Sequence, residues 1–225
     1  ASSLVFACGL FGILGGKVYY AILVQDWRMI FDRAGIVWYG GFLAGTLAFF
    51  WIMRRRRLPY PQTLDAGGPA LALGYAVGRV GCFLVGDDYG IPTDKPWGVA
   101  FENGLPPSTA ANLRYQFGVD VPPHIADGQL LAVHPTQLYT TAASLAIFGA
   151  SLWLAKRVRL RPGALFLVVV MALSVERFLV EFLRAKDDRF FDDTFTVAQL
   201  ISVLIFVVCI VAAWRRGLVE PDAPA

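Results

Sequence analysis

The chain has 225 residues, of which 56% are hydrophobic and only 16% are charged, and its mean hydropathy is +0.56. This composition excludes an ordinary soluble domain and indicates a polytopic membrane protein. The formal net charge of +3 is small, and we expect no nucleic-acid partner.

Six stretches approach the roughly 20 apolar residues that a membrane-spanning helix needs. In chain order they cover residues 3–23, 35–53, 64–84, 135–154, 163–183 and 195–214. Residues 85–134 between the third and fourth stretches contain several prolines and no apolar span. The sequence therefore predicts an all-α membrane protein with six transmembrane helices. We expect residues 1–225 to form a single membrane domain, with residues 85–134 inserted as an extracytoplasmic head or arm.

Basic residues gather at alternate ends of the predicted helices, and these clusters hold ten of the 20 lysines and arginines. By the positive-inside rule, these ends face the cytoplasm. The other connections are acidic, which predicts that residues 85–134 face outside. The chain is then expected to begin inside, cross six times and end inside. The basic clusters are Arg54–Arg57, then Lys156, Arg157, Arg159 and Arg161, and finally Arg215 and Arg216.

Three basic residues, Lys17, Arg79 and Arg177, interrupt otherwise apolar spans. A charge at the membrane centre costs roughly 2.5–3.5 kcal/mol even on a mild scale, so such residues usually face a polar cavity. The predicted orientation places all three in the outer half of the membrane. In the fifth stretch, Arg177, Glu181 and Arg184 share one helix face, with Glu181 and Arg184 at its outer mouth and Arg184 nearest to water. Two guanidiniums that flank a carboxylate are typical of a phosphate or carboxylate clamp.

Structural roles are the alternative for these residues. The charged residues of the fifth stretch could form an ion network that joins helix ends, and Arg79 could pair with another helix. The ammonium group of Lys17 could extend toward the membrane surface. Glu176 lies on another helix face than Arg177 and has no assigned partner. His134 could be a helix cap, and Asp87 could belong to a solvated turn. Tyr39 could be an aromatic residue at the membrane interface.

A glycine-rich segment runs from the outer end of the third stretch into the loop after it: Gly78-Arg79-Val80-Gly81-Cys82-Phe83-Leu84-Val85-Gly86-Asp87. It resembles the G-R-x-G-N-F-x-N-G-E signature of bacterial prolipoprotein diacylglyceryl transferases. Other segments resemble that family's motifs in the same order. Residues 15–17, Gly-Gly-Lys, resemble G-G-R, while 96–101 match P-W-G-x-x-F, 134–139 match H-P-x-Q-L-Y, and 177–184 match R-x-x-x-E-x-x-R. The resemblance extends over nearly the whole chain.

The resemblance implies transfer of diacylglyceryl from phosphatidylglycerol to the cysteine thiol of a lipobox-containing prolipoprotein in the bacterial inner membrane. We expect no cofactor and no metal. The expected catalytic residues are Arg79, Arg177, His134, Asp87 and Tyr39. The expected substrate-binding residues are Gly78, Gly81, Lys17, Glu181, Arg184 and Tyr139.

This chemistry makes two demands. The phosphodiester must be held while its negative charge grows, which suits Arg79 and Arg177. The thiol, with a reference pKa of about 8.5, must lose its proton. The imidazole of His134 has the most suitable pKa for this, and Asp87 could orient it or act directly. With a pKa of about 10, Tyr39 is better suited to positioning the substrate.

The chain departs from the family pattern at several positions. Tyr39 stands where the family usually has a histidine, Cys82 and Val85 replace asparagines, Asp87 replaces glutamate, and Thr140 replaces an acidic residue. The family has seven spans, and this chain is expected to begin at the second. Two alternatives therefore stay open. One is a lipid transferase with another acceptor, and the other is a non-catalytic binder or transporter of anionic lipids.

Overall fold

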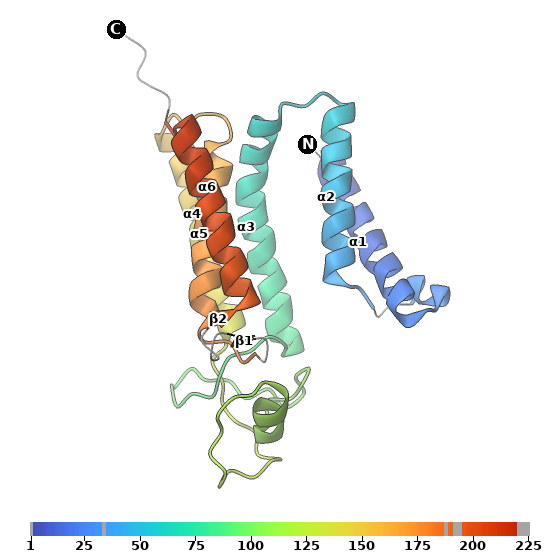
Figure 1. The fold of residues 1–225 in the computed structure, drawn as a ribbon, viewed down its shortest axis with the longest axis vertical. Helices are drawn as coiled ribbons and strands as arrows, with labels where there is room; N and C mark the ends of the chain where they lie inside the picture. The colour runs from blue at the N-terminus through green and yellow to red at the C-terminus, as the bar shows by residue number, and fades with distance from the viewer. Residues whose placement is uncertain (1, 33–34, 187–188, 191–194, 220–225) are drawn as a thin grey trace. The chain divides into compact units, whose positions relative to one another are not determined.

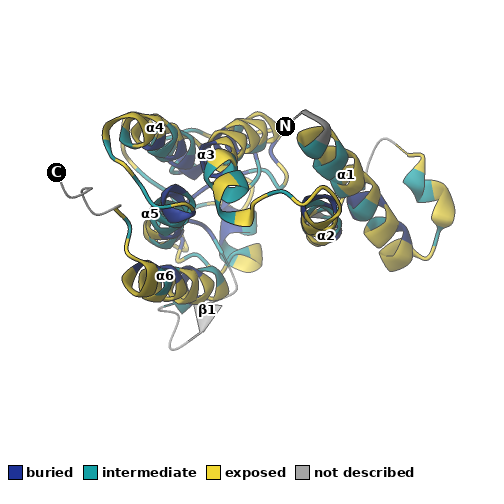
Figure 2. Cartoon of the chain, turned by 90° about the horizontal axis from the view of Figure 1, so that it is seen from above, coloured by how far each residue is buried: buried dark blue, intermediate teal, exposed yellow. Residues whose placement is uncertain are grey.

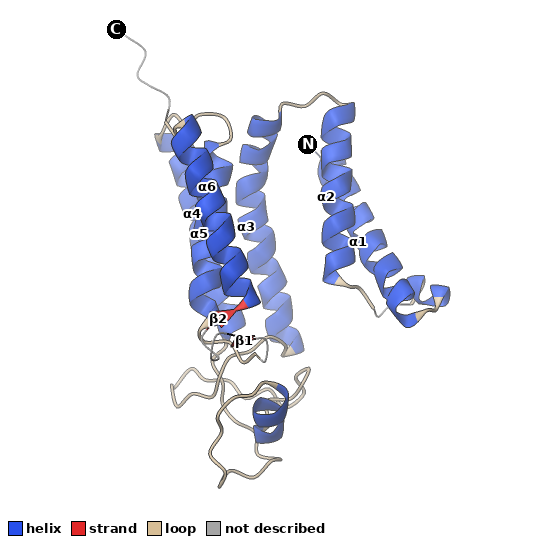
Figure 3. Cartoon of the chain, in the orientation of Figure 1, coloured by secondary structure: helices blue, strands red, loops and turns tan. Residues whose placement is uncertain are grey.

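The computed structural model describes residues 2–32, 35–186, 189–190 and 195–219. Six long α-helices carry most of these residues (Figures 1 and 3). Each lies over one of the six predicted apolar stretches, so the all-α membrane-type fold is confirmed. The helices are α1 (Ser2–Val24), α2 (Trp38–Arg55), α3 (Tyr60–Val85), α4 (Thr136–Arg157), α5 (Ala164–Glu181) and α6 (Val197–Arg216).

The short elements of the described chain lie in the connections. They are a 3-10 helix η1 (Trp27–Ile30), a π-helix η2 (Asn112–Gln116), and strands β1 (Arg189–Phe190) and β2 (Phe195–Thr196), which pair antiparallel.

Four of the described helices are long and apolar enough to cross a membrane by length and composition: Leu4–Val24 of α1, and α3, α4 and α6. These helices indicate a multi-pass membrane protein. The other two long helices, α2 and α5, also carry charged residues. The last turn of α2 contains Arg54 and Arg55, and α5 contains Glu176, Arg177 and Glu181. The crossing of the membrane by all six helices stays a prediction.

The chain divides into two compact units, residues 1–60 and 61–225, and each is described by itself. In the first unit, α1 and α2 approach each other through glycines. A Cβ added to Gly15 would lie 2.5 Å from the carbonyl oxygen of Gly40, and one added to Gly41 would lie 3.0 Å from that of Gly12. Small residues permit such close contact between helices.

In the second unit, α5 lies between α4 and α6 (Figure 2). Helix α3 packs against α5 at Gly68, where an added Cβ would lie 3.4 Å from the Cα of Phe166. The N-terminus of α5 is capped from α3, because the carboxylate of Asp65 accepts hydrogen bonds from the backbone N–H of Gly163 at 2.6 Å and of Phe166 at 2.9 Å.

At the basic end of this bundle, Arg161 makes two hydrogen bonds to backbone carbonyls near the end of α6. The N–H of Arg161, in the connection between α4 and α5, donates to the carbonyl of Leu218 at 3.0 Å. The guanidinium of Arg161 also donates to the carbonyl of Arg216. The basic residues after α4 and those at the end of α6 therefore share one end of the unit, as the charge pattern predicts.

Residues 86–135 lie beyond the C-terminal end of α3 (Figure 1). They are mostly irregular and have a small hydrophobic core of their own, to which Tyr89, Phe101, Leu113 and Val133 belong. Two backbone hydrogen bonds join this region to the segment after α5: Ile91 N–H to Leu183 at 2.9 Å, and Ala185 N–H to Tyr89 at 3.2 Å. Its extracytoplasmic position stays a prediction.

Candidate active site

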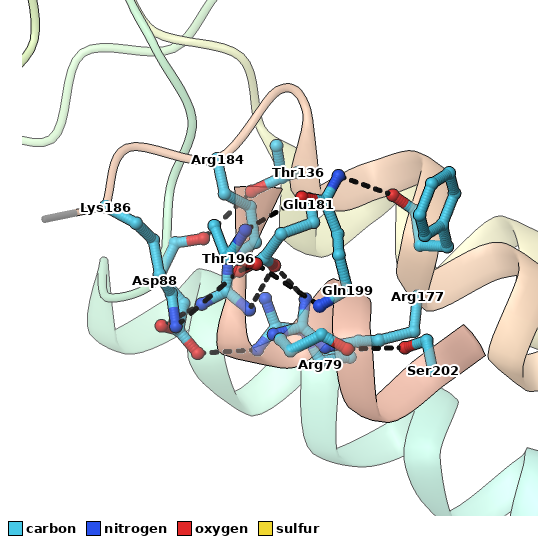
Figure 4. Close-up of polar contacts among 12 residues, drawn as sticks. Arg79, Asp88, Thr136, Arg177, Glu181, Arg184, Lys186, Thr196, Gln199 and Ser202 are labelled. Atoms are coloured by element: carbon cyan, nitrogen blue, oxygen red, sulfur yellow. Dashed lines mark hydrogen bonds and ion pairs between the residues drawn. The ribbon is translucent and has the colours of Figure 1, made fainter. Parts of the chain in front are cut away.

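A carboxylate shared by two arginines forms the centre of the site (Figure 4). Arg79, on α3, donates from Nη1 to Oδ2 of Asp88 at 2.8 Å. Arg184, just past α5, pairs with the other oxygen, Oδ1. Both guanidiniums are buried, whereas the side chain of Asp88 is 41% exposed. The carboxylate therefore closes the outer side of a buried pair of guanidiniums.

A second carboxylate extends this network toward α6 (Figure 4). Glu181 is buried and pairs with Arg177 one turn earlier on α5. Its Oε2 lies 3.9 Å from Nη1 of Arg184, and its Oε1 lies 4.0 Å from Nζ of Lys186. The hydroxyl of Thr196 donates to Oε1 at 3.1 Å. Four cationic side chains thus share two carboxylates.

The position of Arg184 differs from the expected one. Helix α5 ends at Glu181, and Arg184 lies in a turn that forms an isolated antiparallel bridge with Gly90. Sequence reasoning placed this arginine nearest to water, but it is only 4% exposed. The reason is that residues 89–91 cover it from the head side through backbone pairing.

The loop that carries Asp87 and Asp88 is anchored to the start of α4. Thr136 donates through its hydroxyl to the carbonyl of Asp88 at 2.8 Å, and the amide of Gln137 donates to that of Asp87 at 2.5 Å. Asp88 has a left-handed backbone (φ +59°). Burial acts to raise the pKa of its carboxyl, but the charge of Arg184 and the hydrogen bond from Arg79 outweigh burial and hold that pKa below its usual range.

Glu176 lies inside the bundle without a well-formed partner. It is 6% exposed, and both carboxylate oxygens are buried without a hydrogen bond of ordinary geometry. The Thr140 hydroxyl and the charges of Arg177 and Arg79 lie close enough to interact with it. An isolated buried carboxylate is costly, so the surrounding arginines are what makes it tolerable here.

The histidine of the H-P-x-Q-L-Y segment belongs to a short hydrogen-bonded chain. Nδ1 of His134 lies 3.0 Å from the hydroxyl of Tyr139, which accepts from Nε1 of Trp97 at 2.7 Å. Tyr139 therefore takes the orienting position that sequence reasoning gave to Asp87. Burial and the nearby charge of Lys95 lower the pKa of His134 below its usual value, which keeps the ring neutral at physiological pH.

Asp87 faces the end of α3. Its Oδ1 is buried without a hydrogen bond, and one oxygen each from Asp87 and Asp88 lies with Sγ of Cys82 in a group less than 4.8 Å across. These atoms are possible metal ligands. Nη1 of Arg79 contacts both Cys82 (3.4 Å) and Asp88, so a cation there would meet a fixed positive charge. We assign no metal to this group.

Two of the other expected site residues lie in the first unit. Lys17 is buried on α1, and its ammonium donates to the carbonyl of Asp32 at 2.5 Å. Tyr39, near the start of α2, is 70% exposed. Gly78 and Gly81 lie on α3, and among the described residues no neighbouring heavy atom comes within 4 Å of a Cβ built on either.

A cavity of about 400 Å³ opens beside the network. Asp87, Asp88 and Lys186 line it with polar atoms, and Tyr89, Pro106 and Phe117 line it with apolar surface. The carboxylate that joins the two buried arginines therefore borders an open space with room for a small group.

Sequence reasoning missed several members of the site. Thr196 and Gln199 form a capping box at the start of α6, and their T-x-x-Q spacing was a recognisable signal for it. Asp88 was not among the expected site residues, because nothing in a linear sequence shows that its carboxylate reaches Arg184. Lys186 belongs to no motif or helix pattern that would have pointed to the site.

The fold and the site together define a class: a multi-pass helical membrane protein with a buried arginine network at one end of its bundle, suited to holding an anionic group. Comparison with known proteins refines this. The model of the prolipoprotein diacylglyceryl transferase family matches residues 1–215. The chain therefore belongs to the prolipoprotein diacylglyceryl transferase family.

Three relatives illustrate the similarity, and each is named phosphatidylglycerol–prolipoprotein diacylglyceryl transferase. The protein from Clostridium tetani is 30% identical over 205 residues, which cover 88% of this chain and 73% of the relative. The protein from Xylella fastidiosa is 30% identical, and the match covers 98% of this chain and 79% of the relative. The protein from Rhodococcus jostii is 32% identical, and the match covers 94% of this chain and 60% of the relative. This chain thus spans between three fifths and four fifths of these relatives.

Proposed function

We propose that this protein transfers a diacylglyceryl group from phosphatidylglycerol to the cysteine thiol of a lipobox-containing lipoprotein precursor, in the bacterial inner membrane. Family membership supports the reaction class. The observation that carries the proposal is the buried network in which Arg79, Arg177, Arg184 and Lys186 share the carboxylates of Asp88 and Glu181. This excess of cationic groups suits a phosphodiester.

The reaction forms one bond and breaks one. The thiol sulfur attacks the glycerol carbon that carries the phosphate ester, a C–S bond forms, and the C–O bond to phosphate breaks. The electron pair leaves with glycerol phosphate. Guanidiniums that are already positioned and shielded from water stabilise this leaving group better than solvated ones. Arg79 and Arg177 are assigned this role.

The thiol proton needs an acceptor. His134 is the proposed base, because its lowered pKa keeps it neutral and its Nδ1 is fixed by Tyr139. Nε2 can accept a proton when Nδ1–H donates to the hydroxyl of Tyr139. The hydrogen bond from Trp97 to the same hydroxyl leaves that oxygen an acceptor for this arrangement. Asp87, with one unpaired buried oxygen, is the second candidate.

Two observations keep an alternative function in view. Tyr39 and Cys82 occupy positions where the resemblance expects histidine and asparagine. These changes favour a second candidate, a transferase that uses the same lipid donor with another thiol or hydroxyl acceptor. A non-catalytic binder of anionic lipids would need the arginine network but not His134.

A peptide assay tests the proposal. Purified protein is incubated with phosphatidylglycerol and a lipobox peptide, and the peptide is weighed by mass spectrometry. The proposal expects the mass of one diacylglyceryl group to be added, and no addition to a peptide whose cysteine is replaced by serine. Modification of the serine peptide would favour the other acceptor class. Lipid binding without modification of either peptide would favour the non-catalytic binder.

A further inference from the structure

We propose that Asp88 is a built-in competitor for phosphate: its carboxylate occupies the place between Arg79 and Arg184 that a phosphate group takes, and must leave when that group binds. The inference rests on the proposed function, because it takes the arginine pair to be the site that binds the donor phosphate. It adds a residue that sets how tightly phosphate ligands are held, and it assigns the site a closed state.

The geometry of the contact carries the argument. Each oxygen of Asp88 meets a different guanidinium, Oδ2 that of Arg79 and Oδ1 that of Arg184. A phosphodiester offers the same arrangement of two unbridged oxygens, and guanidiniums bind carboxylates and phosphates through the same fork of N–H donors. Nε of Arg79 is buried without a hydrogen bond, so a phosphate finds a further donor there.

The difference in exposure shows which group can move. The side chains of Arg79 and Arg184 are 8% and 5% exposed, but that of Asp88 is 41% exposed. The arginines are therefore fixed in the protein, while the carboxylate lies at the rim. The backbone carbonyl of Asp88 is held by Thr136 at 2.8 Å, so its release is a side-chain rotation and needs no loop movement.

The released carboxylate has a place to go. Asp88 and Lys186 both line the cavity of about 400 Å³ beside the network, and the charge of Lys186 already acts on the carboxyl of Asp88. Rotation toward this lysine would exchange two pairs with buried guanidiniums for one pair that is more solvated. Partly exposed pairs contribute little, so the exchange costs energy that the phosphate must supply.

The test measures phosphate binding without any acceptor peptide. Wild type, Asp88→Asn and the matched control Asp120→Asn, which alters an exposed aspartate of the head, are solubilised in an uncharged detergent. Thermal unfolding is followed as glycerol phosphate is added, and in a separate arm as phosphatidylglycerol is added in mixed micelles. A ligand that binds only the folded state raises the midpoint according to its dissociation constant. The two arms distinguish a free phosphate from a lipid headgroup.

Asp88→Asn should bind the phosphate probe about three- to tenfold more tightly than wild type, corresponding to the loss of the two partly exposed charge pairs with Arg79 and Arg184. Asp120→Asn should bind like wild type. Equal affinity in wild type and Asp88→Asn, or weaker binding by the variant, would overturn the inference while leaving the phosphate role of the arginines intact. No binding to any variant would overturn that role as well.

Asp88→Asn leaves two buried guanidiniums short of a partner and can fail to fold, so a measurement on the wild-type protein decides the matter independently. A carbodiimide with glycine ethyl ester labels free carboxylates, and mass spectrometry reads the labelling of Asp88, with Asp120 as the internal reference. Labelling of Asp88 should rise at least about threefold when the phosphate probe is bound. Labelling that is unchanged or falls would show that the carboxylate stays on the arginines.

Discussion

At the scale of single residues, the site depends on the balance between its cationic and anionic side chains. Three guanidiniums at the end of a membrane bundle would be expensive alone, and the chain offsets them with Asp88 and Glu181. Removing one partner of a buried pair costs more than the pair contributes, because the other charge is left unpaired. Substitutions here therefore affect both folding and activity, and each experiment must separate the two.

The arginines give the first prediction. Arg79→Ala and Arg177→Ala should each lower the rate of diacylglyceryl transfer by about 10²–10³-fold, as loss of one preorganised donor to a developing anion does. Lysine at either position should restore only part of the activity, because the fork of donors is lost. Transfer is measured with the lipobox peptide, and folding with thermal unfolding.

Arg159→Ala, an exposed arginine at the basic end of the bundle, is the matched control and should behave like wild type. Since Arg184 is buried and holds both Asp88 and Glu181, Arg184→Ala should be as damaging as the other two, contrary to its expected position near water. A folded Arg79→Ala protein with wild-type turnover would remove the phosphate role.

The second prediction concerns the thiol proton. His134 must be neutral to accept it, and its pKa lies below the ordinary value of 6.5. The protonation of His134 should therefore not limit the transfer rate above pH 6.5. The rate should fall as the pH drops through the lowered pKa of His134. His134→Gln should lose most activity at neutral pH and recover as the pH rises toward the pKa of the thiol, about 8.5. The rate is measured as a function of pH.

Tyr39→Phe is the comparison variant. An unperturbed phenol is protonated across the physiological range, so we expect this variant to retain measurable activity. If Tyr39→Phe were inactive and His134→Gln active, the assignment of the base would be wrong. If both were active, the thiol would have to ionise unaided beside the arginines.

At the scale of elements, apolar stretches predict the helices well. Six stretches gave six helices with small differences at their ends, because about 20 apolar residues in a row have few other stable conformations in a bilayer. The ends were harder to predict. The start of α5 is fixed by Asp65 of α3, far away in sequence, and the turn after Glu181 is fixed by pairing with the head. Such contacts have no local pattern.

The cap on α5 yields the third prediction. Asp65 satisfies the backbone N–H groups of Gly163 and Phe166 at the helix start. Asp65→Ala should reduce the free energy of unfolding by about 1–2 kcal/mol, the usual cost of losing a cap. Asp65→Asn should lose less, because an amide oxygen still accepts one hydrogen bond. Unfolding in detergent by denaturant measures both, and Asp120→Ala serves as the exposed control. An unchanged midpoint for Asp65→Ala would show that the cap contributes nothing.

At the scale of the whole molecule, charge asymmetry predicts orientation. In the second unit the basic residues of the α4–α5 connection and of the end of α6 share one end, and the head region lies beyond the other end of α3 (Figure 1). The family motifs also predicted that Arg79, Arg177, Glu181 and Arg184 would meet. The motifs did not predict Asp88 at the centre, because its role depends on a turn that brings residues 88 and 184 together.

The fourth prediction is this orientation. In a variant without native cysteines, a cysteine at position 55 should be shielded from an impermeant thiol reagent in intact cells, and one at position 120 should react. Position 120 suits the experiment because Asp120 is exposed. Reaction at position 55 but not at position 120 would reverse the topology.

The central claim is that the arginine network holds the phosphate of a lipid donor while a thiol displaces it. The most direct measurement follows both products of one incubation with phosphatidylglycerol and the lipobox peptide: glycerol phosphate by phosphorus NMR, and the modified peptide by mass spectrometry. The account predicts that the two appear in equal amounts, and that both fall together in Arg79→Lys. Release of glycerol phosphate without peptide modification, or no release by a folded wild-type protein, would contradict it.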